Sequence, residues 1–209
     1  MEIEYKGGNA VVISTKKLDV LIDPKLSQLG LKDVTSKHGC VVATQAEFVP
    51  KDTAGSVVID GPGEYEVDDI SINGVAAERM IDHDGSKQST IYRVATSDVT
   101  VAVIGHSSCP LSEQQLETLS VVDIVVVPVG GNGYTLNANQ AVEVVRQLEP
   151  KVVIPTHYAD KAAKYEVPQD ELELFTRELA ADVQELPKLK IKNCQLPEVL
   201  TVYKLTRVA

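Results

Sequence analysis

The chain has 209 residues, of which 44% are hydrophobic and 24% charged, and its formal net charge is −10. This length suffices to bury a hydrophobic core, and so acidic a chain disfavours binding to nucleic acid. Its three cysteines, Cys40, Cys109 and Cys194, form no CxxC pair, which argues against a disulfide framework or a cysteine zinc site. The longest apolar run, residues 121–129, contains Asp123 and is too short to cross a bilayer. We therefore expect a cytoplasmic protein without nucleic-acid or membrane partners, and a homo-oligomer stays open.

The first half of the chain has the pattern of β-strands. Short runs rich in Val and Ile at residues 11–13 and 20–22 are separated by the polar segment 14–17, which predicts a hairpin. A second hairpin is predicted over residues 90–95 and 99–104, on either side of a polar turn. Further strands are predicted at residues 40–43, 57–59 and 70–72.

Helical patterns enter in the second half. Ser112 stands three residues before Gln115, and Asn137 three residues before Gln140, so each pair predicts a capping box at a helix start. Pro150 should end the second helix. Alternating lysines at 188, 190 and 192 indicate an edge strand. The predicted elements are helices at 112–119, 137–148 and 169–180 and strands at 122–127, 151–154 and 199–205. We expect a single α/β domain over residues 1–209.

Several loops that follow predicted strands are rich in glycine and polar residues, and taken together they carry a family resemblance. They resemble the metallo-β-lactamase superfamily and, within it, bacterial proteins known only as zinc-dependent hydrolases. The resemblance implies an αββα sandwich of two mixed β-sheets with helices on the outer faces and a two-metal site at one edge. In chain order the segments are Leu21-Ile-Asp-Pro24, Gly61-Pro-Gly-Glu-Tyr-Glu66, Val127-Pro-Val-Gly-Gly131, Tyr134-Thr135 and Pro150-Lys-Val-Val-Ile-Pro-Thr-His-Tyr158.

The hallmark of this superfamily is a His-x-His-x-Asp-His loop after a buried strand, whose side chains hold zinc ions that activate a water molecule. The resemblance aligns this loop with residues 45–50, where the four ligand positions carry Gln45, Glu47, Val49 and Pro50. Val and Pro side chains have no lone pair to offer a metal. The two-metal hydrolase site is therefore expected to be absent.

Three histidines outside this loop bear on the metal site. The resemblance leaves His83 as the one candidate for the third family histidine, puts His106 in place of the bridging aspartate, and keeps His157 as the final histidine. One imidazole cannot bridge two ions as a carboxylate does. An ordinary structural role is the simpler interpretation for each ring, and His38 has the sequence context of a surface residue.

Two hypotheses of function remain. The leading hypothesis is a metallo-β-lactamase-fold protein with a degenerate metal site, acting as a non-hydrolytic binding or assembly module with no cofactor. The alternative is a metal-dependent hydrolase with a reduced single-metal centre, in which Glu47, His106 and His157 would hold one zinc ion. Whether the protein is an enzyme stays open. Ser107, Ser108 and Cys109 give no sign of a separate nucleophilic site.

Overall fold

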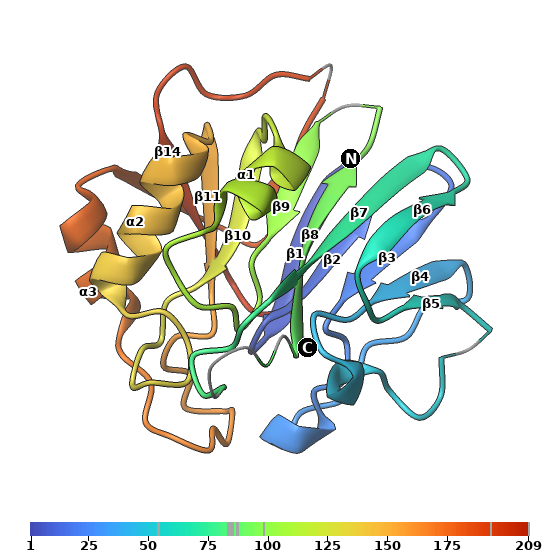
Figure 1. The fold of residues 1–209 in the computed structure, drawn as a ribbon, viewed down its shortest axis with the longest axis horizontal. Coiled ribbons are helices and arrows are strands. Elements are labelled where there is room, and N and C mark those ends of the chain that lie inside the picture. The colour runs from blue at the N-terminus through green and yellow to red at the C-terminus, as the bar shows by residue number, and fades with distance from the viewer. Residues whose placement is uncertain (54, 83–85, 87, 98, 193, 209) are drawn as a thin grey trace.

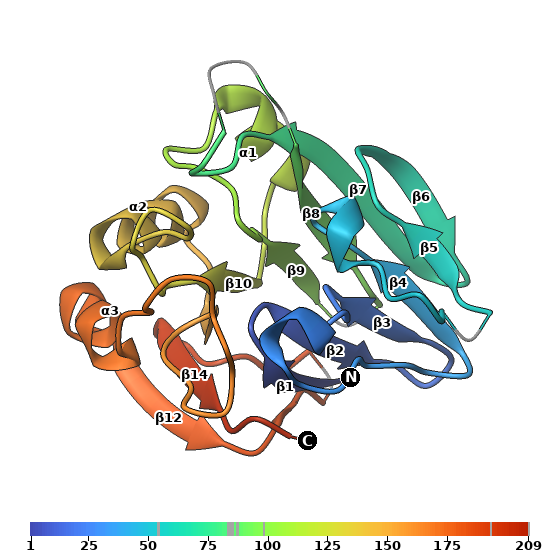
Figure 2. The ribbon, with the colours of Figure 1, turned by 90° about the horizontal axis from the view of Figure 1, so that it is seen from below.

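Two β-sheets face each other in the computed structural model, which describes residues 1–53, 55–82, 86, 88–97, 99–192 and 194–208 (Figures 1 and 2). The first sheet has the strand order β13-β1-β2-β3-β4-β5, and the second has the order β12-β14-β11-β10-β9-β8-β7-β6. Each sheet combines antiparallel and parallel pairs. The prediction of a sandwich of two mixed sheets is confirmed.

The strands are short, and most are rich in Val, Ile and other residues that suit a pleated, half-buried surface. Those of the first sheet are β1 (Glu2–Gly7), β2 (Ala10–Ser14), β3 (Asp19–Ile22), β4 (Gly39–Val42), β5 (Val57–Ile59) and β13 (Leu189–Lys190). Those of the second are β6 (Gly63–Val67), β7 (Ile70–Ala77), β8 (Ser89–Ala95), β9 (Thr100–Val103), β10 (Ile124–Pro128), β11 (Val152–Thr156), β12 (Asp182–Leu186) and β14 (Thr201–Leu205).

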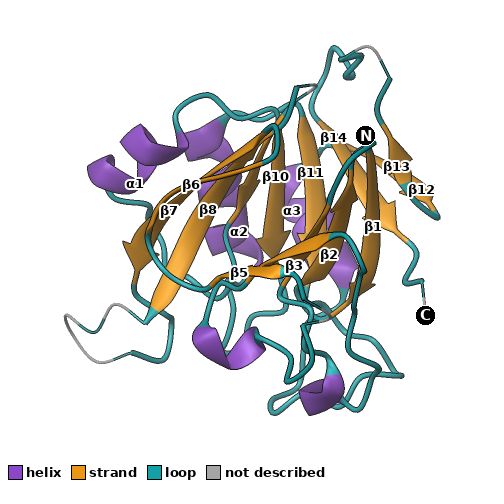
Figure 3. Ribbon diagram, turned by 90° about the vertical axis from the view of Figure 1, so that its right-hand side faces the viewer, coloured by secondary structure: helices purple, strands orange, loops and turns teal. Residues whose placement is uncertain are grey.

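The α-helices lie against the second sheet, on the side away from the first (Figures 1 and 3). They are α1 (Glu113–Leu119), α2 (Ala138–Leu148) and α3 (Leu172–Leu179). Both predicted capping boxes are present, at Ser112 and at Asn137. The outer side of the first sheet carries a small apolar cluster of Val12, Leu21 and Val41, with Val34 packed against it from the loop after β3. No helix in the described part of the chain is long and apolar enough to cross a membrane.

Two apolar layers hold the sandwich together. One lies between the sheets, where side chains such as Ile13 and Val126 are buried, and the other lies between the second sheet and the helices, where Val144 and Phe175 are buried. Removing this apolar surface from water is the main driving force for the fold. The scarcity of aromatics means that Val, Ile and Leu supply most of both layers.

Several elements, among them β1, differ from the sequence predictions. The last helix begins at Leu172 instead of residue 169, because Gln169 and Asp170 make hydrogen bonds to the loops after β11 and β10. Strand β6 occupies residues whose glycines predict a turn, and β12 lies at an exposed edge without a clear alternation of apolar residues. The lysine-rich edge strand is confirmed as β13, where Lys188 and Lys190 pair with Glu2 of β1.

Candidate functional site

The candidate site is a small pocket at the edge where several parallel strands end. Strands β3 and β4 of the first sheet, and β9, β10 and β11 of the second, are followed by loops at this edge, and Figure 3 shows these connections gathered at one end of the sandwich. Ligand sites of open α/β sheets commonly lie at such carboxyl ends. The pocket has a volume of about 40 Å³. Its lining comes from Asn9, Asp23, Lys25, Leu26, Gln28, Leu29, Phe48, His106, Tyr134, His157, Tyr165 and Glu166.

His157 follows β11 directly and is held from both sides. Its backbone has φ of 51°, in the left-handed region that few non-glycine residues adopt. The amide of His157 donates to the carbonyl of Gly8 at 2.8 Å, and Nδ1 of its ring lies 2.9 Å from Oε1 of Gln169. A side chain at position 130 would collide with Gln169 and with the carbonyl of His157, so this position requires glycine.

His106 lies in the loop after β9, and its ring is the centre of an aromatic cluster. Gly105 has φ of 60°, and a Cβ there would stand only 2.7 Å from Thr44, which fixes the approach of this loop to the first sheet. The centroid of the His106 ring lies 4.9 Å from those of His157 and Tyr134 and 5.1 Å from that of Phe48. The turn between β1 and β2 contacts both histidines, because Nδ2 of Asn9 lies 3.1 Å from Nδ1 of His106 and the carbonyl of Gly8 accepts from the amide of His157.

Both imidazoles are almost fully buried, and burial favours their neutral form. Burial lowers the pKa of His157 to about 4, although its hydrogen bond to Gln169 partly opposes this change. Burial also holds the pKa of His106 well below its usual value, and the nearby His157 and Arg79 act in the same direction. At neutral pH the pocket therefore contains two uncharged rings, each able to offer one N–H and one lone pair.

Asp23, directly after β3, brings a buried carboxyl group to the same pocket. Its Oδ1 accepts from the amide of Thr44 and its Oδ2 from the hydroxyl of Thr44, both at 2.7 Å. Burial raises the pKa of Asp23 to about 7, although the two hydrogen bonds from Thr44 partly offset this rise. Asp23 thus ties the ends of β3 and β4 together.

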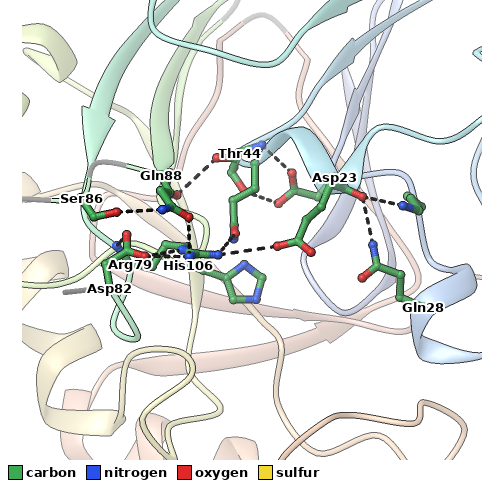
Figure 4. Close-up of polar contacts among 12 residues, drawn as sticks. Asp23, Gln28, Thr44, Arg79, Asp82, Ser86, Gln88 and His106 are labelled. Atoms are coloured by element: carbon green, nitrogen blue, oxygen red, sulfur yellow. Dashed lines mark hydrogen bonds and ion pairs between the residues drawn. The ribbon is translucent and has the colours of Figure 1, made fainter.

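Two side chains of the loop that aligns with the metal-binding motif contact Arg79, whose polar contacts are drawn in Figure 4, whereas Phe48 of the same loop lines the pocket. Gln45 is buried and accepts a hydrogen bond of 3.0 Å from Arg79, and Oε1 of Glu47 lies 3.8 Å from the same guanidinium. Two further groups complete the set around Arg79. Nε donates to Asp82 at 2.8 Å, and Nη2 donates to Gln88 at 2.7 Å.

The structure therefore separates the candidate residues into two groups. His106 and His157 share the pocket, whereas Gln45 and Glu47 lie beside Arg79 and do not line it. Val49 and Pro50 end the loop, His38 is exposed, and His83 lies outside the described residues. Cys109 is half-buried, and burial raises the pKa of its thiol, as does the nearby Glu143, which disfavours a nucleophilic role.

Sequence reasoning missed Asn9, Arg79 and Gln169. Asn9 follows two glycines in a hairpin turn, a context that indicates a turn residue and not a partner for histidine. Arg79 comes from a polar segment without a regular pattern, and Gln169 lies twelve residues beyond the histidine that it contacts. No periodicity signals such contacts.

Fold and edge pocket together define a protein of the metallo-β-lactamase type, and comparison with known proteins agrees. The family model described as the β-lactamase superfamily domain matches residues 2–157. A protein of Nanoarchaeum equitans named a metal-dependent hydrolase is 24% identical over 182 residues, which cover 76% of this chain and 84% of that protein.

Two solved structures share the fold. A Thermotoga maritima protein, described as a zinc-dependent hydrolase of the metallo-β-lactamase superfamily, has a TM-score of 0.76 at 22% identity and 98% coverage of both chains. The metallo hydrolase Igni18 of Ignicoccus hospitalis has a TM-score of 0.61 at 18% identity, over 86% of this chain and 90% of that one. The chain belongs to the β-lactamase superfamily domain family.

Proposed function

We propose that this protein is a non-hydrolytic member of its superfamily, and that it binds a ligand in the pocket between His106 and His157 without a two-metal centre. The observation that carries the proposal is the position of Gln45 and Glu47 beside Arg79. These two residues align with the first two histidines of the family loop.

Arg79 supplies a permanent positive charge at the loop. Its side chain is about one-fifth exposed, whereas the Asp82 carboxylate that receives it is only 2% exposed. A guanidinium remains charged at all relevant pH values, so a divalent cation held by Gln45 and Glu47 would face a like charge at close range. This arrangement supports a loop whose role is structural.

The donor set also fits zinc poorly. A zinc site needs at least three good ligands directed at one point. The described residues contain no group of three or more His, Cys, Asp or Glu side chains that could hold a metal ion. The pocket supplies His106, His157 and Asp23, but both oxygens of Asp23 already accept hydrogen bonds from Thr44, so the set falls short of the requirement.

The competing candidate is a hydrolase with a single zinc ion at Glu47, His106 and His157. The names of the relatives favour it, since they are described as metal-dependent or zinc-dependent hydrolases, and zinc stays a possible cofactor on that basis. Against it, the Glu47 side chain is 50% exposed and directed to Arg79. His157 also uses Nδ1 for Gln169, which leaves Nε2 as its one atom for a metal.

Metal analysis distinguishes the two candidates. Protein purified without chelator or affinity tag should contain zinc well below one equivalent, and zinc or chelator should leave the melting temperature unchanged, because a ligand stabilises only the state that binds it. A single-metal hydrolase would lose stability on chelation, and His157→Ala would abolish that response. His38→Ala, a change at an exposed histidine, is the matched control. A chelator-sensitive melting temperature together with hydrolysis of an ester or phosphodiester would contradict the proposal.

A further inference from the structure

The pocket contains a buried polar atom without a partner among the described residues. This atom is Nε2 of His106, whose residue is 3% exposed. Leaving a buried donor or acceptor unsatisfied costs about 1–3 kcal/mol. Since His106 lines the pocket, Nε2 has the properties of a group that awaits a ligand.

The orientation of the Asn9 amide decides which nitrogen of His106 donates. The structure places Nδ2 of Asn9 3.1 Å from Nδ1 of His106 and Oδ1 of Asn9 3.1 Å from the hydroxyl of Thr156, which donates to it. An amide nitrogen can only donate, and therefore Nδ1 of the neutral His106 ring accepts and Nε2 carries the hydrogen. His106 thus offers the pocket an N–H donor.

The same reasoning gives His157 the opposite role. Nε2 of Gln169 donates to the carbonyl of Val167 at 2.8 Å, which leaves Oε1 of Gln169 facing His157. An amide oxygen can only accept, so Nδ1 of His157 carries the hydrogen and Nε2 keeps a lone pair. The two rings lie at 82° to each other with centroids 4.9 Å apart, so a ring with a free N–H lies against a ring with a free lone pair.

We propose that the pocket binds an uncharged hydroxyl-bearing molecule, whose oxygen accepts a hydrogen bond from His106 and whose hydrogen is donated to His157. This proposal rests on the proposed function, because it assumes that no metal uses the two rings. The volume of about 40 Å³ admits only the hydroxyl end of the ligand, since one water molecule occupies about 10–15 Å³ on the same scale. Leu26, Leu29 and Phe48 offer an apolar wall for a short carbon chain beyond it.

The charges of the lining favour an uncharged ligand. The ammonium group of Lys25 donates to the backbone carbonyl of Glu47 at 2.8 Å, and the Asp23 carboxyl group accepts twice from Thr44. Glu166 lines the pocket as an exposed side chain. A carboxylate or phosphate would meet two neutral rings beside these acidic groups and would lose hydration that the pocket does not replace.

A set of three small probes tests the inference. The probes are 1-propanol, methyl ethyl ether and propionate, which are similar in size and differ in the group that they present. Binding is followed by NMR through the ring nitrogens of His106 and His157. We expect 1-propanol to shift both Nε2 resonances saturably, with a dissociation constant on the order of millimolar. The ether, which cannot donate to His157, should bind at least about tenfold more weakly, because a site built around a hydroxyl discriminates strongly against its absence.

Variants and a metal measurement complete the experiment. His106→Phe keeps an aromatic ring without the donor and should abolish the preference for the alcohol, whereas His38→Gln should retain it. If His106→Phe does not fold, the comparison of alcohol with ether on the unaltered protein still decides. Equal binding of alcohol and ether, tighter binding of propionate, or no response because water alone fills the pocket would each overturn the hydroxyl site. Those results in metal-free protein leave the proposed function intact, whereas stoichiometric zinc would contradict the proposed function itself.

Discussion

The two sides of the edge pocket differ in how far the protein itself satisfies their polar groups. On the first sheet, the side chains of Gln45 and Glu47 contact the guanidinium group of Arg79, so both have partners within the protein. On the second sheet, His106 and His157 are buried with defined partners on one ring nitrogen each, and Nε2 of His106 has no partner in the part of the chain that the structure describes. The comparison teaches that the protein itself satisfies the polar groups on the Gln45 and Glu47 side, whereas the histidine side has an atom that a ligand could satisfy.

The largest expected effect concerns Asp23 on the first-sheet side. A folded-state pKa of about 7, against an ordinary value of 3.8, means that the fold keeps a proton which the unfolded chain has lost. The stability that comes from this retained proton is fully present below pH 4 and is lost as the pH rises to 7. It amounts to about 4 kcal/mol at 1.36 kcal/mol per pKa unit.

The variant Asp23→Asn imitates the protonated acid at every pH. Between pH 4 and 7, the free energy of unfolding of this variant, measured in urea, should increase relative to that of the unaltered protein. Above pH 7 the difference between the two proteins should stay constant. A difference that does not depend on pH would mean that Asp23 ionises normally in the fold.

His157, on the second-sheet side, should show the opposite slope. Its pKa is lowered from 6.5 to about 4, so the unfolded chain binds a proton that the folded ring refuses. The stability that follows from the lowered pKa of His157 is fully present above pH 6.5. About 3 kcal/mol of it is lost as the pH falls to 4. The variant His157→Gln should therefore lose less stability on acidification than the unaltered protein. His38→Gln is the control, and an equal loss in both variants would remove the distinction between the two sides.

Arg79 tests how firmly the first-sheet side is closed. Arg79→Ala leaves Gln45 and the buried Asp82 carboxylate without their donor, and we expect the free energy of unfolding to fall by about 2 kcal/mol. Arg79→Lys keeps the charge but not the branched geometry, so it should recover only part of the loss. If the alanine variant is as stable as the unaltered protein, the arginine does not hold this loop.

The smallest effect is expected at Glu47. Its side chain is half-exposed and its distance to Arg79 is 3.8 Å, so Glu47→Gln should change the unfolding free energy by less than about 0.5 kcal/mol. The same variant should leave the response to zinc unchanged. A zinc-dependent shift in melting temperature that disappears in Glu47→Gln would mean that Glu47 binds zinc together with the pocket histidines, and it would favour the single-metal centre.

The sequence by itself determined the elements that depend on neighbouring residues. The Val- and Ile-rich runs gave the strands of both hairpins, and Ser112 and Asn137 gave the helix starts, because capping boxes and strand patterns are local. The order of motifs also indicated the superfamily and its fold, since the motifs stand in the sequence in the order that the family has.

Only the tertiary structure decided which groups meet at the pocket. Asn9 reaches His106 across 97 positions and Arg79 reaches Gln45 across 34, and such contacts follow from the closure of the two sheets and not from any local pattern. The same closure explains why the last helix starts late. Gln169 has ordinary helix-forming character, yet its bond to His157 holds it outside the helix. A partly buried hydrogen bond between residues twelve positions apart prevailed there over a weak local preference.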